Sequence, residues 1–266
     1  MISEGSHDEF ARTKTVDFKP RATRYAVVIP ILNEGQTILL QLARMQNSSC
    51  PADIVLCDGD SQDGSTEVQR LAALGVRSIL IVNERGLGTA LRHGIRYAME
   101  QGYEGVVTID GNGKDGIEAI PRFLDLLDQG FDFVQGSRFL AGGKCENTPL
   151  DRYFGIRCFV SPLVSFASRF RFTDPTNGFK GLSRVLLCDP RMSLMRNELN
   201  SFNFQFYLNY RSPRLGFKVI EVPVSRVYPA SGPTPTKITG LRHRVKLVAE
   251  LLWTLAGFYN PPRRKS

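Results

Sequence analysis

Short apolar runs alternate with amphipathic segments over the first half of the chain. The runs that predict strands are Tyr25–Pro30, Asp53–Asp58, Ser78–Val82 and Gly105–Thr108. Helical periodicity predicts helices at Gln36–Met45, Ser65–Leu74, Leu87–Gln101 and from Ile117 onward. Ser65 is the expected N-cap of its helix. Strands that alternate with helices favour an α/β fold with a mainly parallel central sheet flanked by helices.

The regular alternation of strand and helix patterns ends in the second half of the chain, after a further predicted strand at Phe133–Arg138. Ala141–Pro149 is predicted to be a loop, Phe154–Phe170 and Phe202–Tyr210 helices, Phe217–Val224 a strand, and Pro229–Thr236 a proline-rich loop. We therefore expect a polar N-terminal tail (residues 1–23), a main domain (24–230) and a C-terminal loop and helix (231–266).

The C-terminal segment has the pattern of a basic amphipathic helix. Apolar residues recur at steps of three and four: Ile238, Leu241, Val245, Val248, Leu252, Leu255 and Tyr259. The intervening positions include Arg242, His243, Arg244 and Lys246. Such a helix can lie in a membrane interface or pack on its own domain, and the sequence leaves both possibilities open.

Charge and composition indicate which kinds of binding partner the protein has. The formal net charge is +8, from 34 Lys and Arg against 26 Asp and Glu, which suggests an anionic partner. The basic residues gather near the C-terminus rather than among aromatics along a groove, which favours an anionic membrane surface over nucleic acid. Five scattered cysteines without a CxxC pair argue against a disulfide framework or zinc ribbon. We expect a cytoplasmic protein, because no signal-like or membrane-spanning apolar run is visible.

Polar residues follow three of the predicted strands. Asn33 and Glu34 come after the first strand, Asp58 after the second and Asp110 after the fourth. In a doubly wound sheet these strand ends share one edge, where ligands bind. The arrangement suits a nucleotide-sugar, because carboxylates can accept hydrogen bonds from a base or ribose and can hold a metal that bridges a diphosphate.

Several motifs together resemble those of family 2 glycosyltransferases of the GT-A fold, in the branch of dolichol- or polyprenyl-phosphate sugar synthases. Val28–Glu34 is similar to VIPxxNE, Asp58–Ser65 to DDGSxDGT, Gly86–Ala90 to GLGxA, Gly136–Phe139 to GSRY, Asp174–Lys180 to DxTSGFR, and Thr236–Ile238 to SKI. The resemblance runs from about Tyr25 to Lys237, which is most of the chain.

The resemblance implies an inverting transferase that moves a sugar from a UDP- or GDP-linked donor to a polyprenyl phosphate at the cytosolic face of the membrane. The residues expected at the donor nucleotide are Pro30, Asn33, Glu34, Asp58 and Gly88. Asp110 and Asn112 are expected to hold Mg²⁺ or Mn²⁺, or the sugar. Arg138, Arg152 and Lys237 are expected at the acceptor phosphate.

One motif departs from the pattern. The family's DADxQ metal motif is here Asp110-Gly-Asn112-Gly-Lys114. Both an amide and an ammonium weaken a site for a hard divalent cation. Lys114 could instead serve as a diphosphate counter-charge, Asp115 could supply a ligand, or metal dependence could be weak or missing. An arginine that usually precedes SKI is also missing, and Arg226 or Lys237 could take its role.

Two alternatives remain open at this point. Gly111–Gly116 is a literal GxGxxG between a strand and a helix, which is typical of a dinucleotide oxidoreductase. Against this interpretation, Asp110 would face the pyrophosphate, the motif follows the fourth strand, and no acidic residue ends a strand about 20 residues later. The altered metal motif also allows a catalytically retired GT-A domain that binds a nucleotide-sugar.

Overall fold

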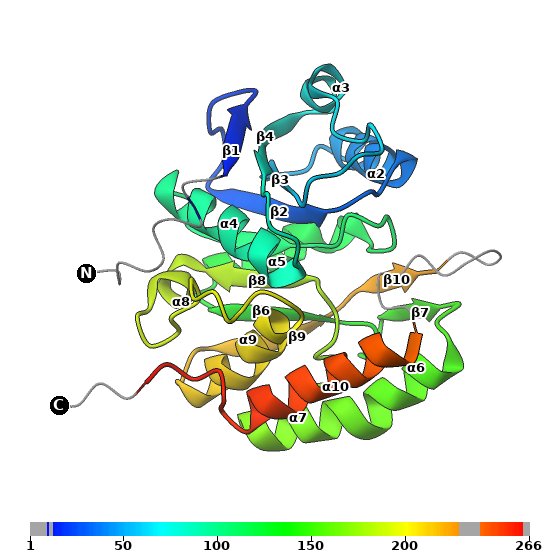
Figure 1. Ribbon diagram of the computed structural model, residues 1–266, viewed down its shortest axis with the longest axis vertical. Helices are drawn as coiled ribbons and strands as arrows, with labels where there is room; N and C mark the ends of the chain where they lie inside the picture. Colours follow the sequence, from blue (N-terminus) through cyan, green and yellow to red (C-terminus); the bar gives the residue numbers. More distant parts are fainter. Residues whose placement is uncertain (1–9, 11–12, 229–239, 263–266) are drawn as a thin grey trace.

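The structure, a computed structural model, describes residues 10, 13–228 and 240–262. Within them, one sheet has the strand order β1-β4-β3-β2-β5-β8-β6-β9 (Figure 1). Its strands are β1 (Lys14–Asp17), β2 (Tyr25–Ile31), β3 (Asp53–Asp58), β4 (Val76–Ile81), β5 (Gly105–Thr108), β6 (Phe133–Ser137), β8 (Lys180–Ser183) and β9 (Val219–Pro223). β1 and β8 run antiparallel to their neighbours, whereas the other pairings are parallel. The predicted mainly parallel sheet is therefore confirmed.

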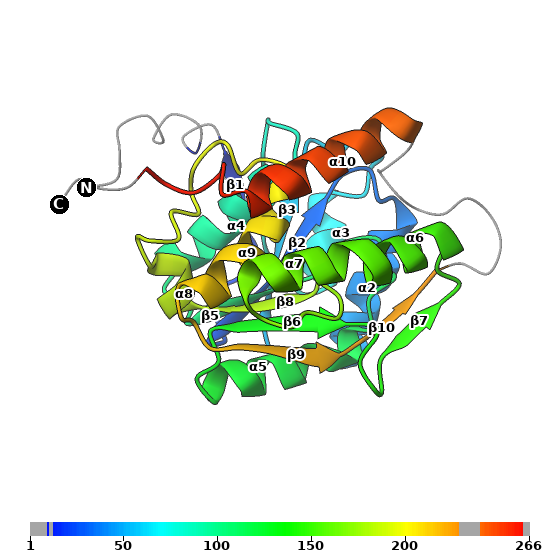
Figure 2. The ribbon, with the colours of Figure 1, turned by 90° about the horizontal axis from the view of Figure 1, so that it is seen from below.

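Helices cover both faces of the sheet. They are α2 (Gln36–Asn47), α3 (Val68–Ala73), α4 (Leu87–Glu100), α5 (Ile120–Asp128), α6 (Leu150–Gly155), α7 (Ser161–Ser168), α8 (Arg184–Cys188), α9 (Asn203–Arg214) and α10 (Gly240–Leu255). Figure 2 shows α5 on one side of β6 and β8, and α7 and α9 on the other.

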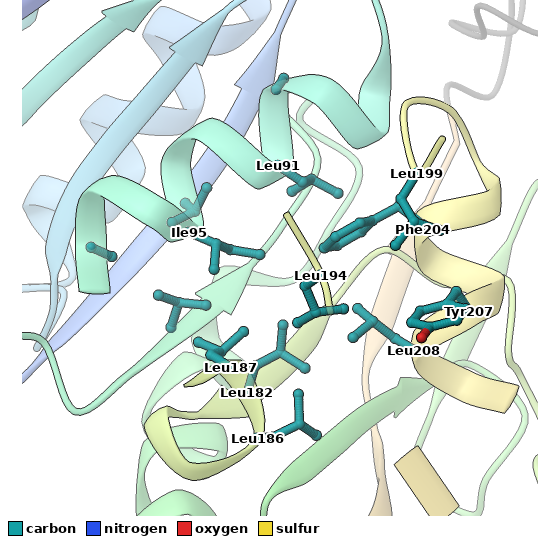
Figure 3. Close-up of a cluster of buried hydrophobic side chains, with 14 of the residues drawn as sticks. Leu91, Ile95, Leu182, Leu186, Leu187, Leu194, Leu199, Phe204, Tyr207 and Leu208 are labelled. Carbon is teal, nitrogen blue, oxygen red and sulfur yellow. The ribbon is translucent and has the colours of Figure 1, made fainter. Parts of the chain in front are cut away.

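The central strands are buried on both faces, which explains their continuous apolar runs. Alternate residues of β2 point to opposite sides. Ala26 and Val28 belong to the apolar cluster under α4 and α9, whereas Val27 and Ile29 belong to the cluster under α2 and α5. Figure 3 shows the first of these clusters, in which Leu91 and other residues of α4 face residues of α8 and α9.

The sheet order places the expected donor residues together. β2 lies between β3 and β5, and the chain order reverses between β2 and β5. The carboxyl ends of these three parallel strands therefore meet at a topological switch point. Asp58 ends β3, Asn33 lies two residues beyond β2, and Asp110 lies two residues beyond β5.

Three local predictions were wrong. Lys14–Asp17 lie inside the predicted polar tail but form edge strand β1, paired with β4. The predicted loop Ala141–Pro149 contains β7 (Lys144–Glu146), which pairs with β10 (Ser225–Val227). Strands of three or four residues are too short to show alternation. Ser65 does not cap α3, because that helix begins at Val68 and the Ser65 hydroxyl donates to Asp63.

The predicted helix Phe154–Phe170 is found in consecutive pieces. α6 leads into a π-helical turn (Ile156–Val160), which leads into α7. A π turn takes up one extra residue. Phe154 and Phe159 are five positions apart and can therefore lie on the same side of the continuous helical segment. Pro162 lies in the first turn of α7, where a missing N–H is tolerated.

Lys180 on β8 is a fully buried lysine of the core. Its ammonium donates to Oδ1 of Asn209 at 2.9 Å and to Oε1 of Gln135. Burial lowers the pKa of Lys180 to about 7, because a charged ammonium is disfavoured away from water. The folded protein therefore binds this proton less tightly than the unfolded chain does.

This difference predicts a pH-dependent stability. Between pH 7 and about 10.4 the unfolded chain holds the Lys180 proton and the folded chain releases it, so stability rises with pH by up to about 1.4 kcal/mol per unit. Replacing Lys180 by methionine should remove this contribution. Urea unfolding at pH 7.5, 8.5 and 9.5 should show the difference between K180M and wild type changing with pH. K218M, at an exposed position, should run parallel to wild type. A pH-independent difference for K180M would contradict the prediction.

Candidate active site

The Asp58 carboxylate is fixed at the end of β3. It is 2% exposed, and its oxygens accept hydrogen bonds from the backbone N–H of Ser61, at 3.1 and 3.2 Å, and from the Ser61 hydroxyl. Burial raises the pKa of Asp58, and the Ser61 hydrogen bonds oppose that rise. The result is a preorganised acceptor at the predicted nucleotide position.

Hydrogen bonds join the loops that follow β2 and β3. The Asn33 N–H donates to Ser61 Oγ at 2.9 Å, and the Gln62 N–H donates to Asn33 Oδ1 at 2.8 Å. The Gly35 N–H donates to Asp63 Oδ2 at 2.6 Å. Asn33 adopts a left-handed conformation with φ 50°, which asparagine tolerates well. The two loops therefore form one unit, in which Asn33 is exposed beside Asp58.

The other residues expected at the nucleotide lie around this unit. Pro30 is inside β2, in register with Cys57, and Glu34 is half-buried between Asn33 and Gly35. Gly88 is the second residue of α4, where an added Cβ would collide with the carbonyl oxygen of Leu199. The visible role of Gly88 is thus close backbone packing.

Arg226 on β10 joins the carboxylates of Asp110 and Asp115. Its Nη2 lies 2.7 Å from Asp110 Oδ2, and its Nη1 pairs with Asp115 Oδ1. The side chain of Asp115 is fully buried, whereas that of Asp110 is 25% exposed. Although burial alone would raise it, the pKa of Asp110 is held below its usual value by Arg226. Asp110 is therefore an anion that is already paired.

Backbone contacts bring Arg226 to this position. The Val227 N–H donates to the carbonyl of Lys114 at 3.0 Å, and the Gly116 N–H donates to the carbonyl of Ser225 at 2.9 Å. Asp115 and Arg226 also form an isolated β-bridge. β10 thus runs against the loop that follows β5, 116 positions from Asp110 along the chain.

The Asp110 loop is held on its other sides as well. Gln41 of α2 donates to the carbonyl of Asp110 at 3.0 Å and accepts from the N–H of Gly113 at 2.8 Å. Asn112 Nδ2 lies 3.3 Å from Asp110 Oδ2. Gly178 packs against this acid, because an added Cβ would lie 2.7 Å from Asp110 Oδ1 and would displace the carboxylate. These contacts fix the acid on a rigid support.

Tyr228 is the centre of a cluster of basic side chains that the sequence analysis missed. Arg152 Nη1 donates to its hydroxyl at 2.9 Å, and Lys114 Nζ lies 4.8 Å from its ring centroid. The guanidinium carbon of Arg226 lies 6.0 Å from the same centroid. Burial would raise the pKa of Tyr228, but Arg226 and Arg152 lower it. Tyr228 lies one residue beyond β10, and its two-residue spacing from Arg226 is the one sequence signal that could have placed the two side chains together.

Arg138 is buried beside this cluster. Its Nε and Nη2 donate to the two carboxylate oxygens of Asp174 at 2.6 and 2.8 Å, and Nη2 also donates to Thr176 Oγ1 at 3.0 Å. Burial opposes ionisation, but the Asp174 charge raises the pKa of Arg138. The Arg138 guanidinium is therefore held by hydrogen bonds to the Asp174–Lys180 segment. Lys237, the third residue expected at the acceptor phosphate, lies outside the described residues.

Comparison with known proteins decides the family. A sequence profile of glycosyl transferase family 2 matches residues 26–202. The chain belongs to glycosyltransferase family 2. One relative is a polyprenol monophosphomannose synthase from Mycolicibacterium smegmatis, which is 28% identical over 97% of this chain and 96% of the relative. Another is an undecaprenyl-phosphate mannosyltransferase from Micrococcus luteus, which is 30% identical over 77% of this chain and 84% of the relative.

Solved structures confirm the GT-A fold of this family 2 chain. A glucosyl-3-phosphoglycerate synthase from Mycobacterium tuberculosis superposes with a TM-score of 0.61, at 18% identity, over 88% of this chain and 81% of that one. That structure contains Mn²⁺, UDP and glucosyl-3-phosphoglycerate. The dinucleotide interpretation of Gly111–Gly116 was wrong, because the segment leads into a 3₁₀ turn (Ile117–Ala119) in a glycosyltransferase.

The donor set around Asp110 does not fit a divalent cation. Asp110 and Asp115 share one guanidinium, Asn112 turns its amide nitrogen toward Asp110, and Lys114 is a neighbouring cation. Nowhere in the part of the chain that the structure describes do three His, Cys, Asp or Glu side chains converge in a way that could hold a metal ion. The expectation of Mg²⁺ or Mn²⁺ on Asp110 and Asn112 therefore finds no support in this geometry.

Proposed function

We propose that this family 2 enzyme transfers a sugar from a UDP- or GDP-linked donor to a polyprenyl phosphate. The observation that carries the proposal is the meeting of Asp58, Asp110 and a cluster of basic side chains at one sheet edge, in a chain whose relatives are named for polyprenyl-phosphate mannosyl transfer. The acids suit a nucleotide-sugar, and the basic residues suit two phosphate groups.

The reaction is a direct displacement. A phosphate oxygen of the acceptor forms a bond to the anomeric carbon as the bond from that carbon to the donor diphosphate breaks, and the nucleoside diphosphate leaves with the electron pair. The acceptor phosphate is already an anion near neutral pH, so the step needs orientation and charge compensation rather than a general base. Attack from the face opposite the leaving group inverts the anomeric centre.

Individual residues take separate roles in this proposal. Asp58 accepts hydrogen bonds from the nucleoside, and the Asn33–Glu34 loop lies beside it. Arg152 and Lys237 bind the acceptor phosphate. Arg138 contributes its positive charge and holds the segment that packs against Asp110, rather than reaching the acceptor directly.

A donor screen tests the proposal. The full chain should gain thermal stability with UDP-sugars or GDP-sugars and not with NAD, because a ligand that binds the native state raises its apparent stability. The screen identifies the base of the donor. The proposed function would be overturned if only NAD raised the melting temperature, or if none of the nucleotide-sugars did.

We further propose that the protein meets its lipid acceptor as a peripheral membrane protein at the cytosolic face. No described helix is long and apolar enough to span a bilayer. A row of exposed apolar side chains instead follows α6, the π turn and α7: Leu150, Phe154, Phe159, Leu163 and Phe166. Phe166 is 89% exposed, which is unusual for a phenylalanine in a soluble domain.

α10 extends this apolar face. Figures 1 and 2 both show α10 beside α7, and Arg244 of α10 pairs with Asp151 of α6 at 2.7 Å. Leu251 is buried against the core and Leu255 packs beside it, so one side of the helix lies on the domain, whereas Val245, Val248 and Leu252 of the predicted apolar face are exposed. The outward side chains are Val245, Val248, Leu252 and Trp253, flanked by the exposed Arg242, Arg244 and Lys246. Apolar and basic groups together suit an anionic bilayer surface.

Removing two exposed rings should weaken membrane binding. The double variant F159S/F166S should lose about 2 kcal/mol of binding energy, or on the order of 30-fold in partitioning, because each ring would no longer enter the lipid. Cosedimentation with phosphatidylglycerol vesicles measures this. L40S, at a position 65% exposed on α2, should bind as wild type does. Equal partitioning of F159S/F166S and wild type would contradict membrane docking through this face.

A further inference from the structure

We propose that Arg226 and Lys114 together supply the positive charge that holds the donor diphosphate, so that donor binding by this enzyme requires no divalent cation. The inference rests on the proposed function. It assigns to Arg226, on β10, a direct role at the donor that sequence motifs gave only as one possibility for a missing arginine.

The position of the Arg226 guanidinium is the first argument. It bridges Asp110 and Asp115, the two carboxylates of the loop that follows β5, and its side chain is 9% exposed. A cation that bound both acids would have to expel this group. Expulsion would break a buried ion pair, which is strongly unfavourable, and would leave a positive charge next to the incoming metal.

Charge balance is the second argument. Asp110 and Asp115 carry two negative charges, and Arg226 and Lys114 carry two positive ones. A divalent cation between two carboxylates gives the same total. Lys114 is buried, with only 6% of its surface exposed, and it interacts electrostatically with Asp110. The two side chains thus place in the site the charge that a metal would otherwise bring.

Preorganisation is the third argument. Both cations pack against the Tyr228 ring, Lys114 at 4.8 Å and Arg226 at 6.0 Å from the centroid. Backbone pairing between β10 and the Lys114–Gly116 segment fixes their separation. Each Nη of a guanidinium carries two hydrogens, and the carboxylates use one on each nitrogen. The second pair of N–H groups suits phosphate oxygens, for which arginine has the matching planar geometry.

Isothermal titration of the full chain with UDP-sugars and GDP-sugars tests the inference, once in excess chelator and once with Mn²⁺. Wild type should bind its donor with dissociation constants that agree within about twofold. Binding at least tenfold weaker in chelator would overturn the inference and leave the proposed function standing. Failure of every nucleotide-sugar to bind in either condition would overturn both.

Variants identify the groups responsible. In chelator, R226Q should bind donor about 100-fold more weakly, and K114Q about tenfold more weakly, because each loses a charge-assisted contact to phosphate. Mn²⁺ should strengthen binding to R226Q and not to wild type, since Asp110 and Asp115 are then available. R191Q, which removes an exposed arginine paired with Asp189, should match wild type.

Separate measurements distinguish a loss of fold in R226Q from the loss of a contact to the donor. R226Q leaves the buried Asp115 without its cation, so its circular dichroism and melting temperature are compared with wild type. If R226Q does not fold, the wild-type chelator titration and K114Q still decide the question. Wild-type affinity of a folded R226Q in chelator, or of K114Q, would contradict the assignment of the corresponding cation.

Discussion

Replacing Asp58 by asparagine is expected to weaken donor binding by about 100-fold, or about 2.7 kcal/mol. The Asp58 carboxylate is an oriented acceptor, because Ser61 donates to it from both backbone and hydroxyl. An asparagine at this position keeps the size of the side chain and replaces one acceptor oxygen with a donor nitrogen. The nucleoside N–H group that the carboxylate would accept from then meets a group that cannot accept.

Titration of the donor into D58N measures this effect, and unfolding by urea confirms that the variant is folded. D125N provides the control, because Asp125 is an exposed carboxylate on α5, remote from the carboxyl edge of the sheet. Donor affinity of D58N within about threefold of wild type would show that Asp58 does not contact the nucleotide.

Replacing Asp174 by asparagine is expected to reduce the free energy of unfolding by about 3–5 kcal/mol. The Asp174 side chain is fully buried, and both of its carboxylate oxygens accept from Arg138, whose side chain is 3% exposed. The variant leaves a guanidinium inside the protein without its counter-charge. Such an uncompensated buried charge is among the most destabilising changes that one substitution can make.

Urea unfolding at pH 7 checks this prediction. The double variant R138M/D174L should recover most of the lost stability, because it removes both charges and fills similar volume. D189N, which breaks a pair with the exposed Arg191, should change stability little. A loss below about 1 kcal/mol for D174N would mean that the Arg138–Asp174 pair does not stabilise this segment.

Much of the fold was predictable because its central strands are buried on both faces. Asp53–Asp58 and Gly105–Thr108 were predicted with the bounds that β3 and β5 have in the structure. Apolar runs of this kind, separated by helical periodicity, leave few alternatives to a parallel sheet. The carboxyl-edge placement of Asp58 and Asp110 then followed from the strand ends. Edge strand β1 was not predictable, because one partly buried residue, Val16, gives no alternation.

The site was predictable only in part, because its decisive contacts are long-range. Arg226 meets Asp110 across 116 positions, and no local pattern announces that pairing. Arg138 was expected at a ligand, but the sequence alone does not distinguish an exposed arginine from one buried on Asp174, 36 positions away. Tyr228 was missed because a tyrosine two positions after an arginine, just beyond a short strand, is an ordinary feature until the fold places Lys114 and Arg152 around it.

The most direct measurement is the identity of the product. The full chain is incubated with the labelled nucleotide-sugar that the donor screen selects and with a polyprenyl phosphate in detergent. We expect label in the organic phase, a mass spectrum that shows one sugar added to the lipid phosphate, and an anomeric configuration opposite to that of the donor. Polyprenol without phosphate should give no product. Absence of a glycosylated lipid phosphate despite donor binding, or retention of the donor configuration, would contradict sugar transfer by direct displacement.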